Sequence, residues 1–315
     1  MPAPRTHLEI EWRPPRHCGK LQKMRQYHHR PATHTDIAAI HALVAACETA
    51  LHGHPETDPD AIAAEFARTG LHMPTDTRLV HHHDGTLAAR AWVNRRSVID
   101  VHPRHRGQGL GTALSEWAET RAREAGASQI TQTIADIDTA AAQLLRAHGY
   151  QGKVTSWLLQ TTHSDHAPPP PGINLRPYQP GDAHTVHQLL EDAFDEWQQR
   201  RKPYEEWARH TIERTTFAPA MSPIALHGNH IIGAIIALDY PASPDGYIDR
   251  LAVHSGHRGQ GIARHLLHHT FDTFRRHGKP VTTLWTHSDT GALTLYQHLG
   301  MTVRRSSTVY HKDLT

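Results

Sequence analysis

The feature that most constrains this chain is a short glycine-containing segment that occurs twice. His105-Arg106-Gly107-Gln108-Gly109 recurs as His257-Arg258-Gly259-Gln260-Gly261. Two weaker matches flank the segment in the same order: Arg30-Pro31 and Asp36 with Arg176-Pro177 and Asp182, and His148-Gly149-Tyr150 with Leu299-Gly300-Met301. Three matches at nearly one spacing indicate an internal duplication, so we expect two copies of one domain.

Chain length and a proline run place the boundaries between the copies. The chain has 315 residues, which is enough for two domains that each bury a core. Pro168 to Pro171 interrupts the sequence between the copies, and such a run forms a stiff spacer rather than a helix or a central strand. We therefore predict a disordered extension over 1–25, an N-terminal domain over 26–163, a linker over 164–172 and a C-terminal domain over 173–315.

Apolar spacing predicts the elements of the second copy. The isoleucine-rich run 231–238 predicts a buried strand, and residues 247–253 predict the next strand after a turn. Apolar residues then recur at helical spacing, at Ile262, Leu266, Leu267, Phe271 and Phe274. A strand over 281–285 and a helix over 290–299 follow. The predicted fold class is α/β (α+β), with a sheet flanked by helices in each copy.

The repeated segment has the properties of a phosphate-binding loop. In each copy it lies between a predicted strand and an amphipathic helix. Glycines let the backbone turn tightly, so that amide N–H groups point inward at the start of the helix. Arg106 and Arg258 add positive charge beside the loop. The third glycine of a dinucleotide-binding loop and the Gly-Lys-Ser/Thr ending of an ATP-binding loop are missing, so neither of those loops is matched.

On these residues the sequence resembles the GNAT superfamily of acyl-CoA-dependent N-acetyltransferases. Its loop pattern is Arg/Gln-x-x-Gly-x-Gly/Ala, filled by Arg106, Gly109 and Gly111 in the first copy and by Arg258, Gly261 and Ala263 in the second. Residues 296–301 resemble its second signature, Tyr-x-x-x-Gly-Phe. The resemblance covers residues 27–313, and the arrangement is similar to two-domain actinobacterial members of the mycothiol synthase type.

The resemblance implies a mixed sheet whose central strands splay apart around the pantetheine arm of acyl-CoA. The backbone edge offered to that arm would be Leu251, Ala252 and Val253 in the second copy, and Ile99, Asp100 and Val101 in the first. The pyrophosphate would be held by Arg258, Gly259, Gln260, Gly261, Ile262, Ala263 and Arg264, and in the first copy by Arg106, Gly107, Gln108, Gly109, Leu110, Gly111 and Thr112.

The resemblance also implies that the second copy does the chemistry. Tyr296 stands where the family often has the acid that protonates the departing thiolate, although helical spacing alone would make it a core aromatic residue. The matching residue of the first copy is Leu145, which cannot donate a proton.

The base stays open between three interpretations. Strand alternation would place Tyr247, Asp249 and Leu251 on one face. Asp249 could be the base, a water relayed through Tyr247 could replace it, or Asp249 could be the ion-pair partner of a nearby arginine. At constant spacing the matching residues of the first copy are Arg95 and Ser97, which lack a carboxylate.

Composition narrows the remaining classes of function. A net charge of +2 gives no reason to expect a nucleic-acid partner, and no apolar run reaches membrane-spanning length. Cys18 and Cys47 have no spacing typical of a disulfide framework or a zinc site, which fits a reducing cytoplasm. The 31 histidines are scattered, and even His81-His82-His83, before a hairpin turn, is expected to be solvated surface rather than a metal site.

We therefore expect a cytoplasmic N-acetyltransferase, a monomer or homodimer, that moves an acetyl group from acetyl-CoA to a primary amine of a small molecule. Direct attack of the amine is expected, because neither cysteine lies in a context typical of a nucleophile. The intact loop of the first copy predicts a second, structural or regulatory acetyl-CoA there. The alternatives are a non-catalytic acyl-CoA sensor, which has no reason to keep Tyr296, and a protein-modifying acetyltransferase.

Overall fold

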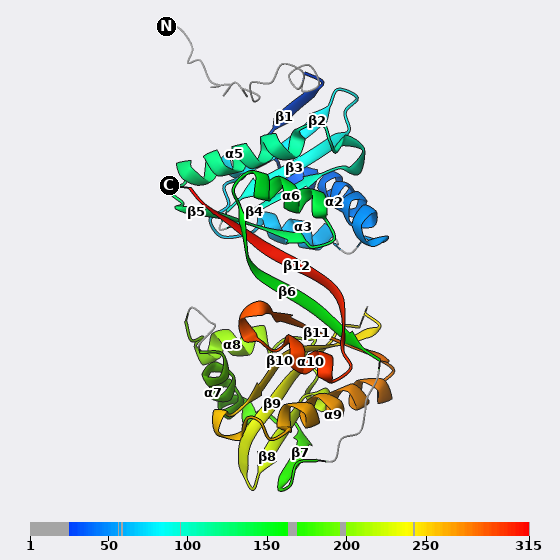
Figure 1. Cartoon of the computed structure of the whole chain (residues 1–315), viewed down its shortest axis with the longest axis vertical. Coiled ribbons are helices and arrows are strands. Elements are labelled where there is room, and N and C mark those ends of the chain that lie inside the picture. Colours follow the sequence, from blue (N-terminus) through cyan, green and yellow to red (C-terminus); the bar gives the residue numbers. More distant parts are fainter. Residues whose placement is uncertain are drawn as a thin grey trace. The chain divides into compact units, whose positions relative to one another are not determined.

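The structure is a computed structural model that describes residues 25–55, 57, 59–94, 96–162, 169–195, 200–241 and 243–314. Residues 1–24 of the predicted extension, Cys18 among them, lie outside the described residues, as do Arg95 and residues 164–168 of the predicted linker. The chain forms two compact units, traced in Figure 1.

The first copy begins with a strand and two long helices and ends with a long strand. Its elements are β1 (Tyr27–Arg30), η1 (His34–Asp36), α2 (Ile37–His52), α3 (Pro59–Phe66), α4 (Met73–Asp76), β2 (Thr77–His82), β3 (Leu87–Val93), β4 (Ser97–Val101), η2 (Pro103–His105), α5 (Leu110–Glu124), β5 (Gln129–Ala135), α6 (Thr139–Ala147) and β6 (Gln151–Thr161).

The second copy repeats this order. Its elements are β7 (Ile173–Pro177), η3 (Pro180–Asp182), α7 (Ala183–Phe194), α8 (Tyr204–His210), η4 (Pro219–Met221), β8 (Pro223–His227), β9 (His230–Asp239), β10 (Asp245–Val253), η5 (Ser255–His257), α9 (Ile262–Arg276), β11 (Val281–His287), η6 (Ser288–Thr290), α10 (Leu293–His298) and β12 (Thr302–Asp313). The strands and helices predicted for this copy are all present.

Each unit is completed by part of the last strand of the other copy. Unit 1 consists of Met1–Lys153 and Thr308–Thr315, and unit 2 of Val154–Ser307. The strand order is β1-β2-β3-β4-β5-β12 in unit 1 and β7-β8-β9-β10-β11-β6 in unit 2. Figure 1 shows β12, in red, reaching the elements of unit 1. The compact units thus differ from the boundaries at 163 and 173, because backbone hydrogen bonds let a terminal strand complete either sheet.

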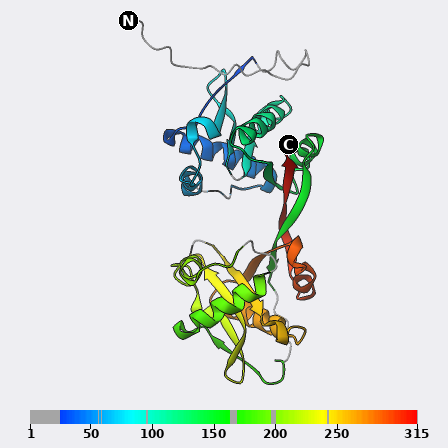
Figure 2. The same ribbon diagram turned by 90° about the vertical axis from the view of Figure 1, so that its left-hand side faces the viewer.

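Both sheets are mixed and carry helices, which confirms the predicted fold class. The strands run antiparallel from β1 to β4 and from β7 to β10, whereas the pairs β4/β5 and β10/β11 are parallel. In unit 2, α9, through Phe274 among other residues, shares one buried cluster with Ile235 of β9. The helices α7 and α8 share another cluster with Ile236 of the same strand. Figure 2 shows α7, green, and α9, orange, on either side of the yellow strands. The sheet of unit 2 is therefore covered on both faces.

The duplication extends to an ion pair at the start of each copy. Arg30 lies 2.6 Å from Asp36, and Arg176 lies 2.6 Å from Asp182. Each aspartate is buried and stands at the end of a short 3-10 helix, just before the first long helix. The weakest of the three sequence matches therefore marks a shared structural feature.

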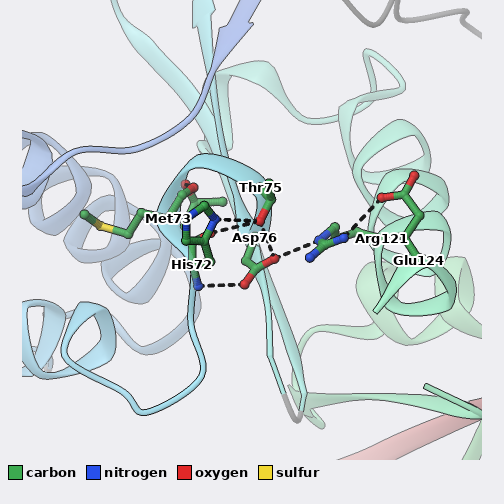
Figure 3. A network of polar contacts seen from close by, with 7 residues as sticks. His72, Met73, Thr75, Asp76, Arg121 and Glu124 are labelled. Atoms are coloured by element: carbon green, nitrogen blue, oxygen red, sulfur yellow. Dashed lines mark hydrogen bonds and ion pairs between the residues drawn. The ribbon is translucent and has the colours of Figure 1, made fainter. Parts of the chain in front are cut away.

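A buried carboxylate joins the short helix α4 to α5 in unit 1 (Figure 3). Asp76 accepts hydrogen bonds from the His72 backbone N–H at 2.7 Å and from Thr75 Oγ1 at 2.9 Å, and pairs with Arg121 Nε at 2.7 Å. Burial opposes ionisation of Asp76, but these hydrogen bonds outweigh it and hold the pKa below its ordinary value. The network fixes the start of β2 against the helix that follows the first glycine-containing loop.

Among the described residues, no helix combines the length and the apolar composition that crossing a membrane requires.

Candidate functional site

The two central strands of unit 2 separate part of the way along their length. β10 pairs with β11 from Asp245 opposite Val281 to Ile248 opposite Leu284. Beyond that point β10 stays with β9, up to Val253 opposite Gly233, whereas β11 continues beside β6. The residues after Ile248 therefore have one backbone edge that faces β11 without pairing to it, as the resemblance implied for Leu251, Ala252 and Val253.

A β-bulge lies at the point of separation. Ile248 is opposite Ala237 and Arg250 is opposite Ile236, so Asp249 is one extra residue in β10. A Cβ on Gly246 would lie against Phe274 of α9, and Ile248 packs into the same cluster as Phe274. After the bulge, Leu251 and Val253 face that cluster.

The bulge corrects the face predicted from alternation. Leu251 faces α9, but Tyr247 lies between Gly246 and Ile248 and faces away from α9. The extra residue shifts the alternation by one position, so Tyr247, Asp249 and Leu251 do not share a face.

The loop after β10 presents backbone N–H groups at the start of α9. Gly259 has φ 75° and Gly261 has φ 79°, left-handed conformations that other residues rarely adopt. Gly261 is the N-cap of α9 and provides no side-chain hydrogen bond to the first turn. Arg258 Nε donates to the Val253 carbonyl oxygen at 3.2 Å, which ties the loop to the strand. The open helix N-terminus and the nearby guanidinium suit a phosphate group.

A cleft of about 690 Å³ connects this loop with the splayed strands. The sequence-predicted residues that line it are Asp249, Leu251, Ala252, Val253, Arg258, Gly259, Gly261, Ile262, Ala263, Arg264 and Tyr296. Tyr247 and Gln260 are not among the lining residues. The lining also includes residues that the sequence reasoning missed, notably Phe194, Arg250, Trp285 and Leu295. The charged pair at 249–250, just before the apolar residues 251–253, was the available signal for Arg250.

Tyr296 lines this cleft from α10. Its side chain is 8% exposed and packs among apolar residues. Burial raises its pKa to about 12, so the phenol is protonated at neutral pH. A neutral buried hydroxyl can donate a hydrogen bond or a proton where negative charge develops.

Asp249 and Arg250 are the charged residues of the cleft at the point where the strands separate. The Asp249 side chain is 13% exposed, that of Arg250 is 40% exposed, and Nη1 lies 3.8 Å from Oδ2. Arg250 Nη1 also donates to the Asp249 carbonyl oxygen at 2.9 Å. Burial, together with the charge of Asp249, raises the pKa of Tyr247 to about 12. Asp249 is therefore both a carboxylate in the cleft and the neighbour of an arginine.

The first copy keeps the loop in the same conformation. Gly107 has φ 72°, Gly109 has φ 91° and is the N-cap of α5, and Arg106 Nε donates to the Val101 carbonyl oxygen at 3.3 Å. That carbonyl also accepts a hydrogen bond from Cys47 Sγ at 3.3 Å. Burial raises the pKa of the Cys47 thiol to about 12, so it is not a thiolate nucleophile.

The first copy differs from the second at the place of the β-bulge. β3 and β4 pair without a bulge, so Ser97, opposite Val93 and Gln132, corresponds to Ile248 and not to Asp249. The constant spacing between the two copies matched Ser97 with Asp249 wrongly, because the bulge adds one residue to β10. Ser97 is buried, and its Oγ donates to the Thr131 carbonyl oxygen. No carboxylate stands at this place in the first copy.

Two leucines stand on α6 where the second copy has Leu295 and Tyr296. Leu145 is buried in the core, and Leu144 Cδ2 lies 3.0 Å from where a Cβ on Gly111 would be. Leu295, by contrast, is 37% exposed and lines the cleft. The first copy thus keeps the loop, has a leucine in place of the phenol of Tyr296, and packs its last helix against the loop helix.

In the histidine group before the hairpin, His81 and His82 are partly buried, whereas His83 is exposed as expected. His82 Nδ1 lies 3.0 Å from Asp84 Oδ2, and the His82 ring contacts those of Tyr27 and His105. Within the described ranges, no three His, Cys, Asp or Glu side chains are placed to hold a metal ion together.

Comparison with known proteins finds one family twice, once in each copy. The model of the Acetyltransferase (GNAT) family matches residues 37–150 and again 183–301. A curated relative, the "Spore coat polysaccharide biosynthesis protein SpsD" of Bacillus subtilis (strain 168), is 25% identical over 182 residues, which cover 52% of this chain and 61% of that protein. The chain thus spans less than two thirds of the length of that relative.

Solved structures are similar over almost the whole chain. A GCN5-related N-acetyltransferase from Sphaerobacter thermophilus is 28% identical, with a TM-score of 0.74 over 92% of this chain and 96% of that one. A tandem GNAT protein from the clavulanic acid biosynthesis pathway is 16% identical, with a TM-score of 0.65 over 92% and 99% of the two chains. The second similarity shows the two-domain fold alone.

Proposed function

Because the chain belongs to the GNAT family of acetyltransferases, we propose that it transfers an acetyl group from acetyl-CoA to a primary amine of a small molecule. In this proposal the second copy catalyses the reaction. One observation carries the assignment: a single cleft brings the phosphate loop together with the unpaired edge of β10, Asp249 and Tyr296. The first copy has the loop without the other reactive groups.

The residues of the cleft fit acetyl-CoA. A Cβ on Gly259 would meet no atom within 4 Å, so there is open space beside this residue of the loop. Residues 258–264 would hold the pyrophosphate, and the edge at Leu251 to Val253 would pair with the pantetheine amides. Acetyl-CoA supplies a thioester whose carbonyl carbon an amine can attack directly.

Two side chains would handle the protons. Asp249 would accept a proton from the acceptor ammonium, because it is the carboxylate that lines the cleft where the strands separate. Tyr247 is a weaker candidate for a base or a relay, since its raised pKa keeps it protonated and it is not part of the lining. Tyr296 would donate its hydroxyl proton to the departing thiolate sulfur.

We propose a structural or regulatory acyl-CoA for the first copy. Its support is the repeated loop geometry, with two left-handed glycines and the same arginine-to-strand hydrogen bond. Leu145 in place of Tyr296 and the missing carboxylate would leave a ligand bound there unreacted.

The alternatives make different demands on the cleft. A non-catalytic acyl-CoA sensor needs the loop and the strand edge, but it does not need a buried phenol at the reactive end. A protein-modifying enzyme would act on lysine side chains. The name of the Bacillus subtilis relative refers to polysaccharide biosynthesis, which favours an acceptor other than a protein.

The test is a screen of primary amines with the full chain and acetyl-CoA, with free thiol as the readout. We expect amine-dependent thiol release and an acetylated amine by mass spectrometry. Saturable binding of acetyl-CoA with no amine-dependent release across the library would favour the sensor. Acetylation of peptide lysines in preference to every small amine would favour the protein-modifying enzyme.

A further inference from the structure

The acceptor side of the cleft contains a cation as well as a carboxylate. Arg250 follows the bulged Asp249, and both side chains line the cleft. Leu251 faces α9, so Arg250 lies on the opposite face of the sheet, the face on which Ala252 packs with α7. Phe194, at the end of α7, lines the same cleft. The bulge thus places opposite charges side by side at the mouth that α7 borders.

The guanidinium of Arg250 is only partly engaged. Within the described part of the chain, its polar contacts are those of Nη1 with the carbonyl and carboxylate oxygens of Asp249, at 2.9 and 3.8 Å. Nε and Nη2 remain available, and the side chain is 40% exposed. An ion pair this long and this exposed adds little stability. A planar guanidinium in this state can take a carboxylate or phosphate through two parallel hydrogen bonds.

An anion bound by Arg250 would not be the pyrophosphate of acyl-CoA. Arg250 stands three residues before Val253, the last residue of β10, and a strand rises about 3.3 Å per residue. Arg250 is therefore about 10 Å from the start of the phosphate loop, next to Asp249. A second cation lies near this face: Arg214 donates to Tyr240 Oη at 3.0 Å, and the Tyr240 ring contacts Tyr247.

The first copy lacks this charge. In the first copy, Val98 of β4 is opposite Trp92 of β3. Counted back from the loops, this is the place of Arg250 in β10, which is opposite Ile236 of β9. Arginine at this position therefore occurs in the copy that also has Tyr296, and an apolar residue occurs in the copy that has Leu145.

We propose that the acceptor carries an anionic group, a carboxylate or a phosphate, a short distance from its amine. Arg250 binds the anion while Asp249 binds the ammonium and accepts its proton. The inference rests on the proposed function, and it narrows the acceptor to zwitterionic small molecules.

The test compares matched amines with acetyl-CoA and the full chain. The pairs are 3-aminopropanoate with propylamine for the carboxylate, and 2-aminoethyl phosphate with ethanolamine for the phosphate. We expect kcat/KM for the anionic member of at least one pair to exceed that of its neutral partner by about 10–100-fold, the usual effect of a charged hydrogen bond. The pair with the larger ratio identifies the anion.

Variants assign the preference to the residue. Arg250→Gln should lower the ratio of anionic to neutral acceptor to about one, and Arg250→Lys should restore part of it, with no change in KM for acetyl-CoA. The control is Arg209→Gln, which should leave the ratio unchanged. Arg209 is an exposed residue of α8 whose Nε donates to the Glu205 carbonyl oxygen. Equal use of both members of each pair, a ratio that survives in Arg250→Gln, or a raised KM for acetyl-CoA would overturn the inference.

Calorimetry separates this inference from the proposed function. Binding of the four amines to protein saturated with CoA is measured in wild type and in Arg250→Gln. Preferential binding of the anionic amines that is lost in the variant, without any thiol release, supports the anion site and refutes the acetyl transfer. Thiol release with no preference supports the transfer and refutes the anion site.

Discussion

Ending the chain after Ser307 should unfold the first unit, although the whole first copy would still be present. The segment Thr308–Thr315 is the last part of the second copy in sequence, but it belongs to unit 1. In unit 1, Lys312 pairs with Glu119 at 2.7 Å and the Leu314 backbone N–H donates to the Ser128 carbonyl oxygen at 2.8 Å. The truncation removes these contacts and leaves β5 without its neighbour β12.

The buried side chains set the magnitude. Tyr310 is 3% exposed and Leu314 is 6% exposed, and burial of each contributes about 1.5–3 kcal/mol. Loss of Lys312 removes the 2.7 Å ion pair of the buried Glu119 carboxylate and leaves it only the more distant Arg123, at 3.8 Å. Losing this partner costs about 1–3 kcal/mol more of the stability of unit 1. The total of about 4–9 kcal/mol is comparable to the about 5–15 kcal/mol that stabilises a whole domain.

Hydrogen exchange measured by mass spectrometry reports each unit separately. In the truncated protein, the amides of β3 and α5 should exchange rapidly, while those of β9 in unit 2 stay protected. The control is Tyr310→Phe, which keeps the packing and loses the 2.9 Å hydrogen bond from Arg146, and should cost about 1 kcal/mol. Protection of β3 and α5 at the wild-type level after truncation would refute the assignment of this segment to unit 1.

The remaining predictions concern the cleft. Tyr296→Phe should lower kcat about 10²–10⁴-fold with little change in acetyl-CoA affinity, measured by steady-state kinetics. Wild-type turnover in Tyr296→Phe would remove this residue from the mechanism. Since the pKa of the Tyr296 phenol is about 12 and its protonated form is the active one, titration of Tyr296 should not reduce kcat between about pH 7 and pH 10. Gly261→Glu should abolish turnover, whereas Gly109→Glu should lower Tm and leave turnover in the folded protein; the reverse pattern would exchange the roles of the two copies. Gly246→Ala should destabilise unit 2 by about 1–3 kcal/mol in urea unfolding, because its Cβ would overlap the Phe274 ring; an unchanged midpoint would contradict that packing.

Local features of the site could be predicted from the amino-acid sequence. A glycine at the start of a helix acts through its own φ angle, so the two loops were identified without knowledge of their neighbours. The apolar face of α9 follows in the same way from the spacing of Ile262 to Phe274. The difference between Tyr296 and Leu145 is a difference of residue type, and the sequence alone contains it.

The tertiary structure alone decided which backbone groups pair. The bulge at Asp249 exists only as a mismatch between β10 and β9, and it determines that Tyr247 faces away from Leu251 and that Arg250 reaches the cleft. The exchange of β6 and β12 is decided in the same way, since any strand offers the same backbone donors and acceptors. Residue type governs φ preference and hydrophobicity, which are local properties, whereas strand register depends on the summed packing of residues distant in the sequence.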